Sequence, residues 1–160
     1  LLHIVVWFVI PSFYFPVLHV IGFNLLRIGL LGYPLYCVLA PGHYPEEALC
    51  IAKGDWKKEF VLLQTATTIN FHTGPLGSFL CSGLQYQIEH HLFPGYSHVN
   101  YPKMAPLVKE FCLQNGYPYR TFGWAEAVLK TFSIFAKPKH VYPDVDSLRQ
   151  AVKEELSATS

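Results

Sequence analysis

Residues 85–94 read Gln85-Tyr86-Gln87-Ile88-Glu89-His90-His91-Leu92-Phe93-Pro94, and they decide how the rest of the chain is interpreted. On an α-helix, Gln87, His90 and His91 occupy positions i, i+3 and i+4, so their side chains lie on one face and can converge on a metal ion. Glu89 points away from that face. The proline that ends the stretch, followed by Gly95, predicts that the helix stops there. The stretch therefore predicts a helix with a candidate metal-binding face.

Leucines before this stretch repeat at helical spacing. At about 100° per residue, Leu76, Leu80 and Leu84 fall within roughly 60° of the direction of Gln87. We therefore expect one helix in which the metal-binding face continues an apolar packing face, with the imidazoles at the edge of a buried cavity. A simpler alternative is that the adjacent histidines offset the dipole at the carboxyl end of the helix and bind no metal.

Charge is unevenly distributed along the 160 residues. Arg27 is the only Asp, Glu, Lys or Arg in the first 45 positions. Residues 1–41 are long enough for two membrane crossings of roughly 20 residues each, near Leu2–Val20 and Phe23–Pro41. Lysines in the remaining sequence predict that this remainder faces the cytoplasm. We therefore expect an all-α integral membrane protein, with a transmembrane helical hairpin at 1–41 and a cytoplasmic helical cap for the metal site at 42–160.

Composition excludes other classes of protein. The formal net charge is +1 and Lys and Arg form no cluster, so no nucleic-acid partner is expected. The four cysteines show no Cys-x-x-Cys spacing, which predicts reduced thiols and no structural zinc site. The chain starts at Leu1 inside an apolar run with no basic segment before it, so a signal peptide is not indicated. We expect that the protein has further sequence before Leu1.

Polar residues interrupt the apolar segment. His19, Asn24 and Arg27 lie near the expected turn between the two spans, and His3 lies at the other end. Interfacial positions, where water or lipid headgroups satisfy these side chains, are the simplest interpretation. His43 follows the second span at its expected cytoplasmic end, where a histidine is more often interfacial than a metal ligand.

Helix signals continue after the apolar segment. Asp55 is a candidate N-cap for a helix whose Trp56 suits the headgroup layer, and this helix is expected to close at 67–72. Asn70 and His72, near its end, suit helix capping as well as a functional site. Further helices are expected at about Pro102–Gln114, at about Gly123–Phe135, and from an N-cap at Asp146 to about Leu156.

The stretch at 85–94 resembles the third histidine box of the front-end membrane fatty acid desaturases. In that class, Gln-x-x-His-His followed by Leu-Phe-Pro replaces the usual His-x-x-His-His, and residues 87–94 match it without a gap. The upstream segment Thr67-Thr68-Ile69-Asn70-Phe71 is also similar to the class. So is the downstream spacing of Tyr101, Pro106, Cys112, Gly116 and Tyr119. The resemblance covers about residues 40–119.

The resemblance implies a role for each matching residue. His90 and His91 are implied to be iron ligands, and Gln87, which takes the place of a ligand histidine, to bind iron weakly or to hold a water. A further histidine at the cytoplasmic end of a span completes the metal site in these enzymes, and His43 has the matching place. No catalytic residue beyond the metal ligands is implied. Residues expected beside the ligands are Asn70, as a hydrogen-bond donor or water-mediated ligand, Glu89, in a structural role, and His72.

The reaction that the resemblance implies is insertion of a double bond into a fatty acyl or sphingoid chain, between an existing double bond and the carboxyl end. It implies two iron ions, O₂, and two electrons from cytochrome b5 or a ferredoxin-like donor. The implied location is the cytoplasmic side of the endoplasmic reticulum membrane in a eukaryote, or of the cytoplasmic membrane in a bacterium.

Parts of the family pattern do not occur in the printed sequence. The family's two earlier boxes, His-x-x-x-His and His-x-x-His-His, are missing from these 160 residues, as is the cytochrome b5-like domain that precedes many of these enzymes. The remaining imidazoles are too few for a pair of iron ions. We therefore expect that this chain is the C-terminal part of an enzyme and is inactive alone.

Two other functions are compatible with the same residues. One is a truncated, non-catalytic membrane protein that packs against an intact desaturase. The other is part of a related membrane diiron enzyme that hydroxylates fatty acids. The metal content of the purified chain separates the first alternative from the main interpretation, and analysis of the reaction product separates the second.

Overall fold

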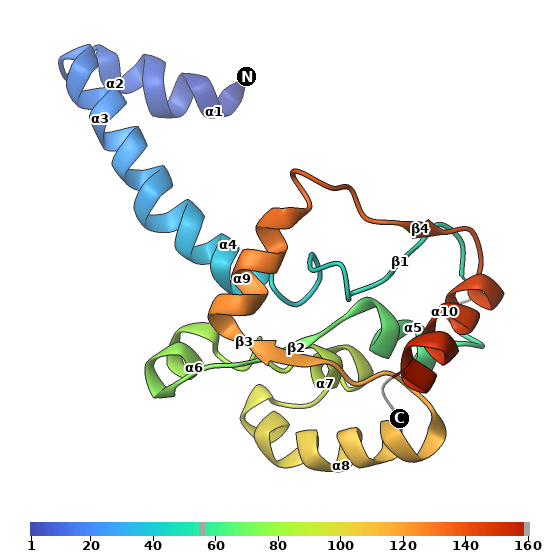
Figure 1. Ribbon diagram of the computed structural model, residues 1–160. Coiled ribbons are helices and arrows are strands. Elements are labelled where there is room, and N and C mark those ends of the chain that lie inside the picture. The colour runs from blue at the N-terminus through green and yellow to red at the C-terminus, as the bar shows by residue number, and fades with distance from the viewer. Residues whose placement is uncertain (55–56, 159–160) are drawn as a thin grey trace. The chain divides into compact units, whose positions relative to one another are not determined.

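The computed structural model describes residues 1–54 and 57–158, and Figure 1 shows the order of its helices and strands. The chain divides into two compact units, Leu1–Cys37 and Val38–Ser160. Helices make up most of both units, as the sequence predicts. Asp55 and Trp56, expected to cap a helix and to suit the headgroup layer, lie outside the described residues.

Apolar helices form the first unit and lead into the second. The segments α1 (Leu2–Ile4), η1 (Val5–Val9) and α2 (Ile10–Ser12) follow one another directly, and so do α3 (Val17–Arg27), η2 (Ile28–Gly32) and α4 (Tyr33–Leu39). The turn between them ends at Pro16, which has an extended backbone and no N–H to donate. Residues Val17–Leu39 form a helix of 23 residues, long and apolar enough to cross a membrane, whereas Leu2–Ser12 is shorter. The turn therefore lies earlier than the expected position near Gly22.

Polar side chains connect the two helices of the first unit. Asn24 is 2% exposed, and its Nδ2 donates to the carbonyl oxygens of Trp7 and Val20, both at 2.9 Å. Arg27 places its guanidinium carbon 4.3 Å from the Trp7 ring centroid and its Nη2 3.2 Å from Nε2 of His3. Amide and guanidinium groups need partners in apolar surroundings. Asn24 and Arg27 therefore contact the preceding helix from within α3. The sequence predicted that they would lie at the turn instead.

Short parallel strands pair in the second unit. Strand β1 (Cys50–Ile51) pairs with β4 (Val141–Tyr142), and β2 (Asn70–His72) pairs with β3 (Thr121–Gly123). Residues 67–72 do not close a helix as expected, because α5 (Phe60–Thr67) ends before Thr68, which is extended, and the chain continues into β2. Strands of two or three residues are too short to give an alternating pattern, so the sequence alone predicts only helices.

Helices α6 and α7 span Pro75–Cys81 and Gln87–Leu92. A turn separates them, in which Ser82 has φ 48° and Gly83 has φ 89°, left-handed conformations that end a right-handed helix. The single helix expected from the leucine spacing is therefore wrong. Leu76 and Leu80 are 72% and 54% exposed and do not continue a buried face into α7.

The remaining described helices are η3 (His98–Asn100), α8 (Tyr101–Asn115), α9 (Trp124–Ser133) and α10 (Val145–Ala158). Helix α8 ends at Gly116, which has φ 68°, and α7 ends before Pro94, so both expected helix ends are confirmed. Helix α10 begins earlier than expected. The Ser147 N–H donates to Oδ1 of Asp144 at 2.9 Å, so Asp144, and not Asp146, is its N-cap.

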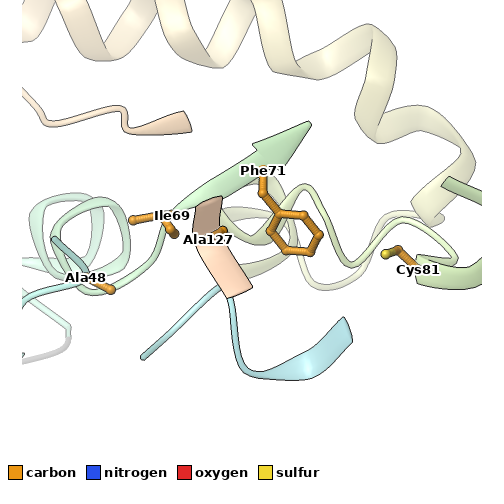
Figure 2. Packing of buried hydrophobic residues seen from close by; sticks show 5 residues of the cluster. All are labelled: Ala48, Ile69, Phe71, Cys81 and Ala127. Carbon is orange, nitrogen blue, oxygen red and sulfur yellow. The ribbon is translucent and has the colours of Figure 1, made fainter. Parts of the chain in front are cut away.

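Clusters of buried residues among the described positions hold the second unit together. One brings β2, α6 and α9 together through Ile69, Phe71, Cys81 and Ala127, with Ala48 beside them (Figure 2). Another packs α5 on α10 through Leu62, Leu63, Ala66, Leu148 and Val152. A further cluster, Ile88, Val108 and Cys112, packs α7 on α8. The four cysteines are free thiols, as expected. These clusters fix β2, α5 and α7, which carry or contact the candidate site residues.

Candidate metal centre

Helix α7 presents the expected ligand residues from a fixed position. Ile88 is fully buried and packs with Val108 of α8, so rotation of α7 would expose an apolar side chain. Gln87 is also buried, at 3% exposed, whereas His90 and His91 are partly exposed. The helix therefore has one buried amide and two accessible imidazoles among its candidate ligands.

The turn after α4 brings a third imidazole to α7. The His43 N–H donates to the carbonyl oxygen of Ala40 at 3.0 Å, which closes this turn. The ring centroids of His43 and His91 are 5.0 Å apart, and those of His90 and His91 are 5.7 Å apart. Three of the four expected ligands, His43, His90 and His91, thus form one cluster, although His43 is far from the other two in sequence.

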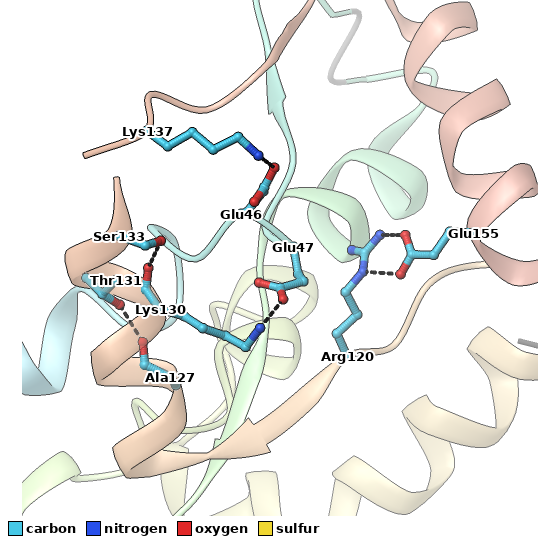
Figure 3. Close-up of polar contacts among 9 residues, drawn as sticks. All are labelled: Glu46, Glu47, Arg120, Ala127, Lys130, Thr131, Ser133, Lys137 and Glu155. Carbon is cyan, nitrogen blue, oxygen red and sulfur yellow. Dashed lines mark hydrogen bonds and ion pairs between the residues drawn. The ribbon is translucent and has the colours of Figure 1, made fainter. Parts of the chain in front are cut away.

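Lysines near the end of the chain hold the loop that carries His43. Nζ of Lys139 donates to the His43 carbonyl oxygen at 2.9 Å. Figure 3 shows two ion pairs further along the same loop, Glu46 with Lys137 at 2.9 Å and Glu47 with Lys130 of α9. The loop that carries His43 is therefore attached to α9 and to the segment after it.

Each histidine of α7 has a partner at Nδ1. Nδ1 of His91 lies 2.9 Å from Oε1 of Gln64 on α5, and Nδ1 of His90 lies 3.3 Å from the Tyr101 hydroxyl on α8. An amide oxygen only accepts, so Nδ1 of His91 carries the proton and Nε2 keeps its lone pair. The Tyr101 hydroxyl donates to the Tyr96 carbonyl oxygen at 3.2 Å, so it accepts from His90 in the same way. Both imidazoles are left with Nε2 as the metal-binding atom.

Burial keeps the imidazoles of His43 and His91 neutral. The pKa of His91 is lowered to about 4, first by burial and then by the neighbouring His43 and His90. Burial is also the main cause that lowers the pKa of His43, followed by the positive charge of Lys139 and by His90. Neutral imidazole is the form that binds metal, because protonation removes the lone pair. At neutral pH, His43 and His91 are therefore ready to act as ligands.

Gln87 is the fourth expected ligand and the one that would offer an oxygen. Its Oε1 is buried and has no hydrogen-bond partner among the described residues. A buried carbonyl oxygen without a partner costs free energy and indicates a missing group, such as a water or an ion. Gly42 makes room for this side chain, since a Cβ there would lie 2.3 Å from Cγ of Gln87. The sequence reasoning missed Gly42, for which the Pro41-Gly42 pair is the available signal.

Helix α7 also carries a buried carboxylate. Glu89 is fully buried, and it accepts hydrogen bonds from Nδ2 of Asn70 at 2.8 Å and from the Tyr119 hydroxyl at 2.7 Å. Oδ1 of Asn70 accepts from the Ile88 N–H at 2.9 Å, so both ends of this amide contact α7. Burial raises the pKa of Glu89, while the bonds from Tyr119 and Asn70 lower it. Asn70 and Tyr119 therefore hold the ligand helix in place through the Glu89 carboxylate and the Ile88 N–H.

His72 lies apart from the imidazole cluster. It is exposed at the end of β2 and lines a separate cavity of about 340 Å³ together with Gln85 and Lys109. The described contacts give His72 no ring contact or hydrogen bond with His43, His90 or His91. The sequence analysis also missed Gln64, which stands beside Thr65 in the otherwise apolar run at 60–66.

The donor set fits iron in kind and is incomplete in number. Neutral imidazoles and an amide oxygen suit iron, and two of the imidazoles have the outer hydrogen bonds usual for metal ligands. Within residues 1–54 and 57–158, no group of three or more His, Cys, Asp or Glu side chains is arranged to hold a metal ion by itself. The described residues therefore bring His43, His90 and His91 together, with Gln87 on the same helix as two of them, but do not complete a metal site.

A comparison of the sequence with protein families identifies the family of the chain. The model of the fatty acid desaturase family matches residues 1–123. The chain belongs to the fatty acid desaturase family. Iron is typical of this family, and its members are membrane proteins, in agreement with the donor set and with the apolar helix Val17–Leu39.

Curated relatives of this desaturase chain act on lipids at several positions. It is 37% identical over 106 residues to the Delta(5) fatty acid desaturase of Caenorhabditis elegans, covering 66% of this chain and 22% of that protein. It is 35% identical over 72 residues to the sn-1 linoleoyl-lipid 6-desaturase of Synechocystis sp., covering 44% and 20%. It is 33% identical over 91 residues to the Delta(8)-fatty-acid desaturase 1 of Arabidopsis thaliana, covering 57% and 19%.

The desaturase chain spans about a fifth of the length of these relatives. No solved structure matches it. The family and the kind of enzyme are therefore established by sequence, while the reaction of the whole protein has to be inferred.

Proposed function

We propose that this chain is the C-terminal part of a front-end desaturase, which inserts a double bond into a fatty acyl or sphingoid chain on the carboxyl side of an existing one. One observation carries the proposal: His43, His90 and His91 form a cluster, and the helix that carries two of them also carries the buried Oε1 of Gln87, which has no hydrogen-bond partner among the described residues. Relatives named as Delta(5), Delta(6) and Delta(8) desaturases support the front-end class.

In this proposal, each residue of the cluster has one task. His90 and His91 would bind iron through Nε2, His43 through its imidazole, and Gln87 through Oε1, directly or through a water. Bound iron, with O₂, supplies an oxidant strong enough to remove hydrogen from an unactivated methylene, which protein side chains cannot do by proton transfer. Two iron ions need more ligands than these four, so the others lie outside the 160 printed residues.

The residues around the cluster position it. Gln64 and Tyr101 hold the imidazole rings, and Asn70 and Glu89 hold α7. His72 stays a candidate for a place near the site in the complete enzyme. In this proposal, no residue of the chain acts as a nucleophile or transfers a proton.

The proposal includes a location and partners. Residues 1–41 form a hairpin in the membrane, whose shorter helix Leu2–Ser12 is joined to Val17–Leu39 by the contacts of Asn24 and Arg27. Residues 42–160 face the cytoplasm, at the endoplasmic reticulum of a eukaryote or at the bacterial cytoplasmic membrane. Cytochrome b5, fused or separate, or a ferredoxin-like protein supplies the electrons, and the substrate is a lipid acyl chain.

Expression of the full-length protein in yeast tests the proposal. New unsaturated fatty acids and sphingoid bases would be identified by mass spectrometry, and iron measured in the purified protein. His90→Ala and His91→Ala should reduce product by more than the roughly 100-fold that loss of an outer partner of a metal ligand can cost. His140→Ala is the matched control, because His140 contacts the Tyr142 ring and no residue of the cluster.

Each outcome has a defined meaning. Full activity of His90→Ala would remove this residue from the ligand set and contradict the proposal. A hydroxylated product would assign the protein to the related hydroxylases. Near-stoichiometric iron in the purified 160-residue chain alone would contradict an incomplete site, and a full-length protein without iron or product would favour a non-catalytic membrane protein that packs against an intact desaturase.

A further inference from the structure

Helix α6 presents its large apolar side chains outward. Leu76, Phe79 and Leu80 are 72%, 79% and 54% exposed, whereas the small residues Gly77 and Cys81 are buried. Helices on the surface of a water-soluble domain normally show the reverse, with large apolar side chains against the core and polar ones outside. The helix thus has a packed inner face of small residues and an uncovered outer face of large ones.

Close packing on the inner face fixes this orientation. A Cβ at Gly77 would lie 2.7 Å from Cβ of Thr73 and 3.0 Å from Cζ3 of Trp124, so even alanine there would force a neighbour to move. Cys81 is fully buried in the same cluster as Phe71, which Figure 2 shows. Rotation of α6 to bury Phe79 would open both contacts. The exposure of the outer side chains is therefore a property of the packed fold.

The polar groups of α6 are satisfied within its own neighbourhood. Oγ of Ser78 lies 2.8 Å from Oγ1 of Thr73, and Oγ of Ser82 donates to the Phe79 carbonyl oxygen at 3.3 Å. The Ser82 N–H donates to the carbonyl oxygen of Ser78 at 3.1 Å, and Pro75 has no N–H at the first position of the helix. Residues 60–88 include no Asp, Glu, Lys or Arg. An apolar medium would therefore leave few polar groups of α6 without a partner.

The buried cluster that contains Cys81 of α6 also contacts Val38. Val38 belongs to the last turn of Val17–Leu39 and packs against the cluster that contains Cys81. Helix α6 has 7 residues, so it is roughly 10 Å long at about 1.5 Å per residue. Val38 and Cys81 of α6 thus share one small group of buried residues within the second unit.

We propose that Leu76, Phe79 and Leu80 insert into the apolar layer of the bilayer that Val17–Leu39 crosses, so that α6 anchors the second unit to the membrane surface. The occupant of the outer face is lipid, and not a second copy of the chain or another protein. Residues 82–86 connect α6 directly to α7. The anchor thereby limits how the ligand helix can turn relative to the bilayer that holds the lipid substrate. The proposal requires Val17–Leu39 to span a membrane and does not depend on the desaturase activity.

Photocrosslinking tests which molecule covers α6. The photoreactive amino acid benzoylphenylalanine would replace Phe79 in the full chain, reconstituted in vesicles of phosphatidylcholine that carries a radioactive acyl chain. The matched control is the same substitution at Lys153, an exposed position on the polar helix α10. Burial of one phenylalanine side chain favours the apolar phase by roughly tenfold or more, so we expect at least about tenfold more lipid adduct at position 79 than at position 153.

Lipid adduct at position 79, with little at position 153, supports the proposal. A crosslink from position 79 to a second copy or to another segment of protein overturns it, as does the absence of any adduct. Helical circular dichroism of both photoreactive variants should match the parent chain, which shows that the substitution at an exposed position leaves the fold intact. Neither result depends on iron or on product, so failure of this proposal is separate from failure of the proposed enzyme.

Discussion

Nδ1 of His91 lies 2.9 Å from Oε1 of Gln64, and this contact joins the ligand helix α7 to α5. The amide oxygen fixes the proton on Nδ1 and leaves the lone pair on Nε2. Helix α5 is itself held by Leu62 and Leu63, which pack on α10. The orientation of a candidate iron ligand is therefore determined by a helix that carries no ligand of its own.

Replacement of Gln64 by Leu should weaken metal binding without unfolding the chain. Leu has a similar volume and removes the acceptor, so the His91 ring loses its fixed tautomer and orientation. We expect roughly a 10- to 100-fold loss of iron affinity in the full-length protein, measured by titration with ferrous iron. Gln114→Leu is the control, because Gln114 is exposed on α8 and contacts Glu110. Equal iron affinity in the two variants would show that Gln64 does not position His91.

Gly42→Ala should disturb Gln87 directly. The new Cβ would lie 2.3 Å from Cγ of Gln87, so either the loop before His43 or the side chain of Gln87 has to move. Overpacking of this kind costs about 1–3 kcal/mol, and we expect a lower thermal midpoint together with lost iron. Gly95→Ala is the matched control, since a Cβ at Gly95 has no atom within 4 Å. A stable Gly42→Ala protein with normal iron content would contradict the packing described.

Asn70→Leu should destabilise the second unit. The Ile88 N–H and one oxygen of Glu89 would both lose their partner in a buried position. Each unsatisfied group costs about 1–3 kcal/mol, and more when it is charged, so the denaturation midpoint should fall clearly.

Tyr119→Phe removes the other donor to Glu89. The double variant should differ from the sum of the single variants, because both act on one carboxylate. Strict additivity would indicate that the three side chains do not form one network.

Local patterns predicted the carboxyl ends of α7 and α8 and the shared face of the residues on α7. The spacing of Gln87, His90 and His91 depends on helix geometry alone, and the end of α8 at Gly116 depends on the conformational freedom of glycine at positive φ. The break at Ser82 was not predictable in this way, since serine seldom adopts a positive φ and the leucine spacing ran on past it.

Contacts between residues that are far apart in the chain could not be predicted from the sequence. The partners of the imidazoles, Gln64 and Tyr101, are ordinary helix residues that only the packing of α5 and α8 against α7 brings close. Similarly, Asn24 and Arg27 looked like residues at a turn, because the contacts that satisfy them come from the preceding helix. Such pairings depend on which elements pack together, which periodicity within one element does not specify.

Asp144 should make the stability of α10 depend on pH. Hydrogen bonds from the backbone and side chain of Ser147 lower the pKa of its carboxyl group in the folded chain. A carboxyl group with a lowered folded pKa stabilises the fold above its ordinary pKa, and this contribution is lost as the pH falls through the folded value. The thermal midpoint of Asp144→Ala should therefore lie below that of the parent at neutral pH, and the difference should shrink in acid.

Asp144→Asn keeps an oxygen acceptor for the Ser147 N–H without a titrating group, so its midpoint should not show this extra dependence on pH. A difference between the parent and Asp144→Ala that stays constant down to acid pH would show that the carboxylate charge adds nothing to this cap.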